Sequence, residues 1–305
     1  MAFFANLFGY LLNFIYNIIG NYGWAIIIFT IVIKLLMLPL AIKQQKTLKK
    51  NTKIQAKMKE IQYKYKNDPE RLNQATMQLY KDENVSPFGG CLSPIIQLVL
   101  ILSIFYLVRS PLTHMKKVDS EVINKYNTIM QEEQLTSASN YPEIDIIRET
   151  ETLKTIENEK INIEEIEQME INTEFLGLDL SQIPSQNKGD WKVFIIPVLY
   201  VLISFASMKL SLGTGIKKDK NKLLNEDNSN PEQKEEELGD MQDVMAQTSK
   251  NMSMIMPIMY LSIAIIAPLG LALYWLVNSI LMIGERLLLN KFIKDDGQEG
   301  QIWQV

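Results

Sequence analysis

Apolar and charged residues are separated into long blocks along this chain. Residues 84–108 contain no Asp, Glu, Lys or Arg, and residues 251–284 contain none either. Uncharged, mostly apolar runs of about 18 or more residues are typical of helices that cross a membrane. The pattern therefore predicts an all-α polytopic membrane protein.

Five membrane-spanning helices account for these blocks. The apolar part of the third is confined to residues 193–208, which at about 1.5 Å per residue covers ~24 Å of a hydrocarbon core of ~30 Å. The last block is too long for one span and carries Pro268-Leu269-Gly270 in its middle, which indicates two helices joined by a tight turn. We place the spans at residues 23–42, 88–108, 191–209, 251–267 and 268–288.

Residues 1–22 form a separate apolar helix before the first span. Asn6, Asn13 and Asn17 fall on one helical face and apolar side chains cover the other, which predicts a helix lying in the membrane interface. A first helix buried within the protein is the alternative interpretation. Gly20-Asn21-Tyr22-Gly23 then ends this helix.

Residues 43–87 have the pattern of a helical hairpin. Apolar residues at helical spacing run from Ile54 to Tyr65, and Asp68-Pro69-Glu70 supplies a capping Asp, a Pro at the first helical position and an acid in the first turn. Residues 210–250 are rich in Gly, Asn and charged residues and are predicted to be a flexible loop. Residues 289–305 form a short tail.

The charge of the loops sets the predicted orientation. Residues 43–87 carry 11 Lys and Arg against 5 Asp and Glu, whereas residues 109–190 carry 8 against 17. Flanks rich in Lys and Arg stay in the cytoplasm, so the hairpin is inside and the acidic segment, residues 109–190, is extracellular. Five crossings then place the N-terminus outside and the C-terminus in the cytoplasm. The formal net charge of −4 conceals this asymmetry.

The composition also excludes several classes of protein. One Cys and one His rule out an intramolecular disulfide and a Cys/His metal cluster. A nucleic-acid binder of overall basic character is ruled out as well, and no phosphate-binding loop motif occurs. We therefore expect no metal, no cofactor, no nucleotide hydrolysis and no direct reading of nucleic acid.

Lys34 is the most informative residue, because it lies inside the first span. A Lys near the middle of a span costs roughly 2.5–3.5 kcal/mol on insertion-based scales, so it normally faces water or a partner. Thr30 lies one turn earlier on the same face. We interpret Lys34 as a cation in a hydrated groove that attracts acidic parts of a ligand; snorkelling to the cytoplasmic interface is the alternative.

The spans contain no Asp or Glu, since Glu285 sits at the cytoplasmic end of the last one. Lys34 is therefore expected to lack an ion-pair partner, and an ion-coupled pump is disfavoured. Gln97 and Asn278 are neutral polar residues that would hydrate the same groove. Hydrogen bonding between helices, worth about 0.6–2 kcal/mol each, is an equally good interpretation of either one.

Several motifs resemble those of the YidC/Oxa/Alb family of membrane protein insertases. The second span carries Gly89-Gly90-Cys91-Leu92 with Pro94 and Gln97, and Phe175-Leu176-Gly177-Leu178-Asp179-Leu180-Ser181 is similar to the segment before the third span in Gram-positive members. The turn between the last two spans reads Pro268-Leu269-Gly270-Leu271-Ala272-Leu273-Tyr274-Trp275. The resemblance covers about residues 20–110 and 172–290.

The resemblance implies five helices around a hydrophilic groove that is open to the cytoplasm and to lipid. In the family the first span carries an Arg in that groove, and Lys34 occupies the matching position here. Gln97 matches a groove residue, and Asn278 lies on a span that guides the substrate. A path along the third and fifth spans would use Ser204, Ser207, Tyr274 and Trp275. The hairpin is implied to contact partners through Lys49, Lys50, Lys53 and Lys57.

The expected function is insertion and folding of small membrane proteins, performed by a monomer in the bacterial cell membrane that is not an enzyme. Nascent membrane proteins and lipids are the expected partners, and the ribosome, the signal-recognition machinery and the Sec translocon are further candidates. A scaffold for assembling membrane proteins is the alternative. An anion transporter is a weaker one, because the inverted repeats of transporters are not found.

Overall fold

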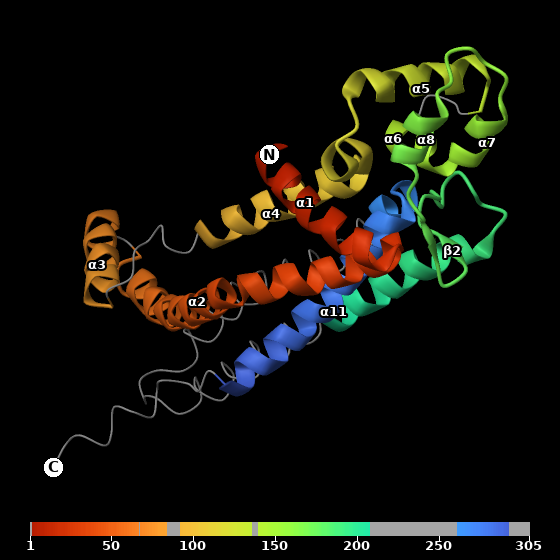
Figure 1. Cartoon of the computed structure of the whole chain (residues 1–305). Coiled ribbons are helices and arrows are strands. Elements are labelled where there is room, and N and C mark those ends of the chain that lie inside the picture. Colours follow the sequence, from red (N-terminus) through yellow and green to blue (C-terminus); the bar gives the residue numbers. More distant parts are fainter. Residues whose placement is uncertain (1, 67, 84–91, 136–139, 208–260, 293–305) are drawn as a thin grey trace.

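The computed structural model describes residues 2–66, 68–83, 92–135, 140–207 and 261–292. Long helices run side by side through the middle of the molecule, and a cluster of short helices covers one end of them (Figure 1). The loop predicted at residues 210–250, most of the fourth span and most of the tail lie outside the described residues.

The N-terminal helix α1 (Ala2–Ile19) ends at the predicted break. Gly20 has φ +70°, a left-handed conformation that favours glycine. Helix α2 (Tyr22–Lys64) follows, and the side chain of Asn21 caps it by accepting a hydrogen bond from the backbone N–H of Trp24.

Helix α2 continues without a break from the predicted first span into the predicted hairpin. Its 43 residues correspond to ~65 Å of helix, and Pro39 lies inside it. Helix α3 (Pro69–Asp82) begins where the sequence predicts, with the Asp68 side chain accepting from the N–H of Arg71 at 3.0 Å. α3 packs back on α2, and Lys57 forms an ion pair with Glu83 across the two helices.

Among the residues that the structure describes, two helices are long and apolar enough to cross a membrane, at Tyr22–Thr47 and Leu269–Leu289. The second belongs to α11 (Leu269–Phe292), which begins directly after Pro268 as predicted. Shorter apolar helices cover the second and third predicted spans: α4 (Leu92–Arg109), and the 191–207 helix, which starts as the 3-10 turn η2 (Trp191–Phe194). Only residues 261–266 of the fourth predicted span are described as helix. These two helices are candidate spans, and the five-span arrangement stays a prediction.

The acidic segment forms a cluster of short helices at one end of the long helices (Figure 1). Its large side chains Tyr126, Met130, Ile146, Leu153 and Ile166 are fully buried, and they belong to one hydrophobic core with the buried side chains of the long helices. Its helices are η1 (Leu112–Lys116, a π-helix), α5 (Ser120–Glu132), α6 (Pro142–Arg148), α7 (Thr150–Thr155) and α8 (Ile163–Met169).

A β-hairpin departs from the all-α prediction. Strands β1 (Glu174–Phe175) and β2 (Leu178–Asp179) pair antiparallel, with Phe175 opposite Leu178. Leu176 and Gly177 both have positive φ (52° and 75°), which is the geometry of a type I′ turn. The short apolar run before the third span therefore turns back on itself rather than joining the helix.

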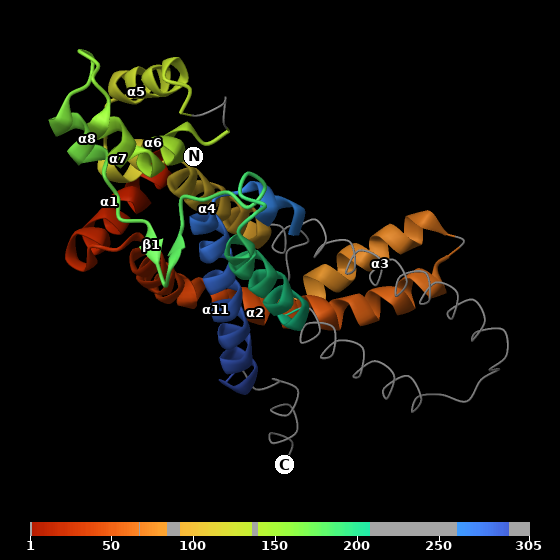
Figure 2. The same ribbon diagram turned by 90° about the vertical axis from the view of Figure 1, so that its right-hand side faces the viewer.

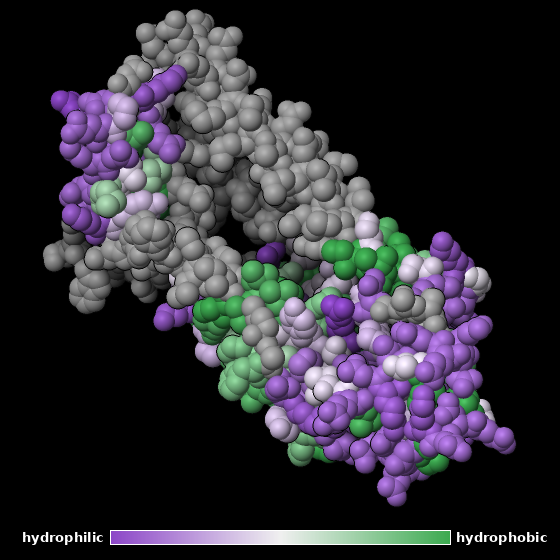
Figure 3. Space-filling view, turned by 90° about the horizontal axis from the view of Figure 1, so that it is seen from above, coloured by the Kyte–Doolittle hydropathy of each residue, from purple (hydrophilic) through white to green (hydrophobic). Residues whose placement is uncertain are grey.

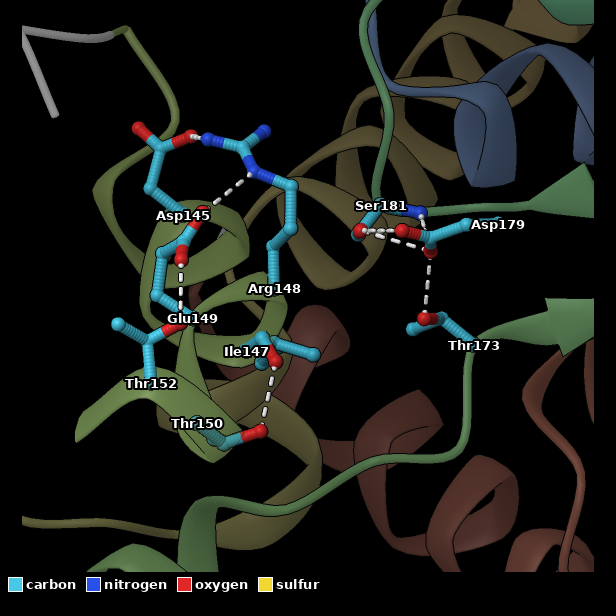
Figure 4. A network of polar contacts seen from close by, with 9 residues as sticks. All are labelled: Asp145, Ile147, Arg148, Glu149, Thr150, Thr152, Thr173, Asp179 and Ser181. Atoms are coloured by element: carbon cyan, nitrogen blue, oxygen red, sulfur yellow. Dashed lines mark hydrogen bonds and ion pairs between the residues drawn. The ribbon is translucent and has the colours of Figure 1, made fainter. Parts of the chain in front are cut away.

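Polar contacts within the acidic segment are local (Figure 4). Arg148 pairs with the buried carboxylate of Asp145 at 2.6 Å and with Glu149 at 3.4 Å. In the hairpin, the half-buried Asp179 accepts hydrogen bonds from the hydroxyls of Ser181 and Thr173. A carboxylate that loses water on burial needs such partners, and these carboxylates find them within a few residues.

Helix α1 has two apolar faces. Ala5, Phe8, Leu12 and Ile15 are buried, and the helix contacts α2, α4 and η1. The opposite face leaves five large side chains exposed: Phe3, Leu7, Tyr10, Phe14 and Ile18. One face of α1 is therefore buried in the protein, as the alternative interpretation expects, and the other is apolar and exposed. The position of the helix in a membrane interface stays a prediction.

The surface of the molecule is divided into apolar and polar zones. In the view from above, hydrophobic side chains gather in a middle zone, and hydrophilic side chains cover the α3 end and the acidic segment (Figure 3). A surface that is apolar in a band and polar at both ends suits a protein surrounded by lipid at its middle.

The contact between α1 and η1 depends on the absence of a side chain at Gly9. A Cβ there would lie 1.8 Å from the backbone carbonyl oxygen of His114, so Gly9→Ala should push the two elements apart. We expect this overpacking to destabilise the protein by about 1–3 kcal/mol. Thermal unfolding in detergent would measure it. Gly284→Ala is the matched control, because nothing lies within 4 Å of a Cβ there; equal losses in both variants would contradict the proposed close contact.

The same contact should weaken at acidic pH. His114 Nδ1 lies 3.0 Å from Asn6 Oδ1, and burial, followed by repulsion from Lys117, lowers the pKa of His114. A lowered folded-state pKa means that the neutral ring stabilises the fold above the unfolded pKa, about 6.5, and that this stability is lost as the pH falls. We expect hydrogen exchange in α1 to accelerate as the pH falls below about 6.5.

His114→Gln isolates this effect, because the amide still reaches Asn6 and does not titrate. The comparison is needed because burial raises the pKa of Glu143, which Thr113 binds through its N–H and hydroxyl, and that group favours the fold at lower pH. An unchanged pH dependence in His114→Gln would show that His114 is not the source.

Candidate functional site

Lys34 of α2 forms an ion pair with Glu285 of α11. The distance from Nζ to Oε2 is 3.2 Å, and each side chain is 21% exposed. The two residues are brought together because α11 packs along α2. The expectation that Lys34 has no ion-pair partner is therefore wrong.

Glu285 is a site residue that the pattern of spans in the sequence does not reveal. The pattern places it at the cytoplasmic end of the last span, away from the middle of the first span where Lys34 lies. Its spacing carried a usable signal, because Glu285 lies seven residues after Asn278 and two helical turns bring both to one face.

The pair borders a small hollow between three helices. Its other lining residues are Met37, Leu40, Ala41 and Gln44 from α2 and Leu100 from α4. The hollow measures about 40 Å³, enough for about one water molecule. The two charges thus meet in a mostly apolar and nearly filled space, where their attraction exceeds that of a surface pair.

The other predicted groove residues lie in different surroundings. Thr30 is buried, and its hydroxyl donates to the backbone oxygen of Ile26 at 2.6 Å, so it is satisfied within its own helix. Asn278 is half-buried on α11. Gln97 lies on α4, but its side chain is outside the described ones.

The four residues predicted for a substrate path are mostly covered. Tyr274 and Ser207 are buried, Ser204 is half-buried, and Trp275 is half-buried with its ring 5.8 Å from that of Tyr200. This ring contact joins α11 to the 191–207 helix, which lies beside it in Figure 2. Both helices expose large apolar side chains, which include Val198, Leu199, Leu202, Phe205 and Ile280.

A larger apolar cleft lies at the other end of the same two helices. It has a volume of about 460 Å³, and the β-hairpin, the start of the 191–207 helix and α11 line it. Lys192 is the one charged residue of its lining. The cleft is well separated along α11 from the ion pair, since Leu273 and Leu276 line it and Glu285 lies more than two turns further on.

The structure describes only part of the predicted hairpin contacts. Lys57 is exposed, and hydrogen bonding to Glu83 raises the pKa of its amine. The side chains of Lys49, Lys50 and Lys53 lie outside the described ones. Within the described part of the chain, no group of three or more His, Cys, Asp or Glu residues is placed to hold a metal ion.

These features define a helical membrane protein with a charge pair enclosed between two of its long apolar helices. A comparison with family models matches residues 14–296 to the family described as "60Kd inner membrane protein". The chain belongs to this family, the YidC/Oxa/Alb family, as the motifs of its second and last spans predict.

Individual relatives match shorter segments. The chain is 43% identical over 110 residues to the membrane protein insertase YidC of Caldanaerobacter subterraneus, a segment covering 36% of this chain and 53% of the relative. The corresponding protein of Fusobacterium nucleatum is 41% identical over 114 residues, 36% of this chain and 56% of the relative. The corresponding protein of Syntrophus aciditrophicus is 51% identical over 94 residues, a segment covering 31% of this chain and 17% of the relative. The matches thus span about half the length of the first two relatives.

The ion pair should couple the stabilities of α2 and α11. Removing either side chain alone leaves a half-buried charge without its partner. The destabilisation of Lys34→Ala and that of Glu285→Ala should therefore add up to more than the destabilisation of the double variant. We expect a coupling energy of about 0.5–3 kcal/mol in a double-mutant cycle measured by unfolding in detergent. Strict additivity would mean that the two side chains do not interact in solution.

Proposed function

We propose that this protein is a membrane protein insertase and chaperone, which inserts small integral membrane proteins and helps them fold without hydrolysing a nucleotide. Family membership and the name shared by its relatives support this function. The observation that carries it is the Lys34–Glu285 pair. Charged side chains between apolar helices are costly to place in a membrane, and they generally mark a functional site.

In this proposal Lys34 captures acidic residues at the outer end of a client segment. We propose that Gln97 of α4 and Asn278 of α11 belong to the same passage, whereas Thr30 is buried one turn before Lys34 on α2. A cation and a carboxylate about 4 Å apart attract by only about 1 kcal/mol in water and several-fold more in a partly dehydrated site. Capture is then strong enough to draw a tail in and weak enough to release it outward.

The apolar part of the client would slide along the 191–207 helix and α11. Ser204, Ser207, Tyr274 and Trp275 are the residues proposed for this path, and the exposed apolar side chains beside them support it. The short helix in this wall would thin the bilayer locally and lower the barrier for a polar tail. The membrane potential adds ~2.3 kcal/mol per acidic charge per 100 mV.

The proposed orientation has the N-terminus and the acidic segment outside a bacterial cell membrane and the hairpin inside. The excess of Lys and Arg in residues 43–87 supports it. Lys49, Lys50, Lys53 and Lys57 are then placed to contact incoming chains, the ribosome or signal-recognition machinery, with the Sec translocon as a further partner. We propose that the protein performs this as a monomer.

Insertion of a small client with an acidic outer tail into proteoliposomes tests the role of Lys34. We expect Lys34→Arg to retain insertion, because it keeps the charge, and Lys34→Ala to lower the rate about five- to tenfold, the loss of roughly 1–1.4 kcal/mol of attraction. The same client with Asn in place of its acidic residues is the control and should be insensitive to both changes. Full insertion of the acidic client by Lys34→Ala would contradict the capture role.

A further inference from the structure

We infer that Glu285 is a specificity-determining residue, an internal carboxylate that occupies Lys34 at rest and that an acidic client must displace. The inference rests on the proposed capture by Lys34. It adds a competitor to that site, and with it a preference among clients.

The geometry makes Glu285 a competitor for Lys34. Lys34 Nζ is 3.2 Å from Glu285 Oε2, within ion-pair distance, and each side chain is still 21% exposed. A client carboxylate that approaches Lys34 therefore meets an ammonium whose charge Glu285 already balances.

Among the described residues, the hollow offers Lys34 no second charge. Its other lining residues are four apolar side chains and the neutral amide of Gln44. In such surroundings an isolated ammonium is costly, because it loses its water without gaining a counter-charge. With Glu285 in place that cost is removed at rest, and a client gains only the difference between its own carboxylates and Glu285.

This exchange makes capture selective. A client with a neutral tail gives Lys34 nothing in return for Glu285, so the pair stays closed. A tail with more than one acid can replace Glu285 and hold Lys34 in turn. A Lys exchanges carboxylates readily, since its ammonium is a point charge with three rotatable donors and needs no planar two-bond geometry.

Removing the competitor should strengthen capture. Glu285→Gln keeps the size of the side chain and removes its charge, so Lys34 is free for a client. We expect cross-linking of an acidic-tail client to rise about three- to tenfold, the effect of deleting a partly buried pair, and cross-linking of a neutral-tail client to stay unchanged. Glu285→Asp keeps the competing charge and should stay close to wild type.

The experiment uses the full-length protein in vesicles of phosphatidylethanolamine and phosphatidylglycerol, with a photoreactive residue at Leu100, which lines the hollow. The probes are two synthetic single-span peptides that differ only in two Asp or two Asn residues in the tail. Glu60→Gln is the matched control, because it removes the same charge from an exposed position in the hairpin half of α2. Thermal unfolding of each variant shows that it is folded.

The outcomes distinguish the capture role of Lys34 from the competitor role of Glu285. If Lys34→Ala leaves cross-linking of the acidic peptide unchanged, the capture role itself fails. If Lys34→Ala abolishes cross-linking but Glu285→Gln does not raise it, capture stands and the competitor role is wrong. A decrease in Glu285→Gln would mean that Glu285 positions Lys34 instead of competing for it, and an equal rise in Glu60→Gln would reduce the effect to overall charge.

Discussion

The ion pair between Lys34 and Glu285 is the constraint that organises the middle of this molecule. An ammonium within an apolar helix requires a counter-charge or water, and here the counter-charge comes from a residue 251 positions away. The requirement ties α2 to α11 at a defined register. It also places the two charges where three helices approach one another, since Leu100 of α4 lines the hollow beside them.

The two ends of the long helices are stabilised by different means. At one end α2 simply continues past the apolar zone and folds back through α3, with polar contacts on the surface. At the other end the buried side chains of the acidic segment share one hydrophobic core with the long helices, and Asn6 of α1 accepts hydrogen bonds from His114 and Lys117. Gly9 allows the backbones to meet at that place. The first helix is therefore held by protein on one face, while its other face presents five apolar side chains.

Local signals in the sequence were sufficient for the helix boundaries. Asp68-Pro69 starts α3, Gly20-Asn21 separates α1 from α2, and Pro268 precedes α11, because capping, φ restriction and a missing N–H act within a few residues. The position of Lys34 in an apolar helix was predictable for the same reason. Features that depend on distant segments were not: the partner of Lys34, the burial of Tyr274 and Ser207, and the fold of the acidic segment. The β-hairpin turn at Leu176-Gly177 was missed because a Leu with positive φ has no sequence signal of its own.

Glu285 changes how strongly Lys34 binds and releases an anion. A lone Lys34 would attract any anion strongly and release it slowly, since the dehydrated site offers no replacement. With Glu285 beside it, arrival and departure of a client carboxylate become an exchange between two similar partners, so neither direction faces the full cost of an unpaired buried charge. A Lys suits this exchange better than the Arg implied by the family resemblance, because a planar guanidinium would hold Glu285 through two bonds and yield it less readily. The substitution of Lys for Arg and the presence of Glu285 are then two parts of one arrangement, a site that is neutral at rest and opens only to a competing acid.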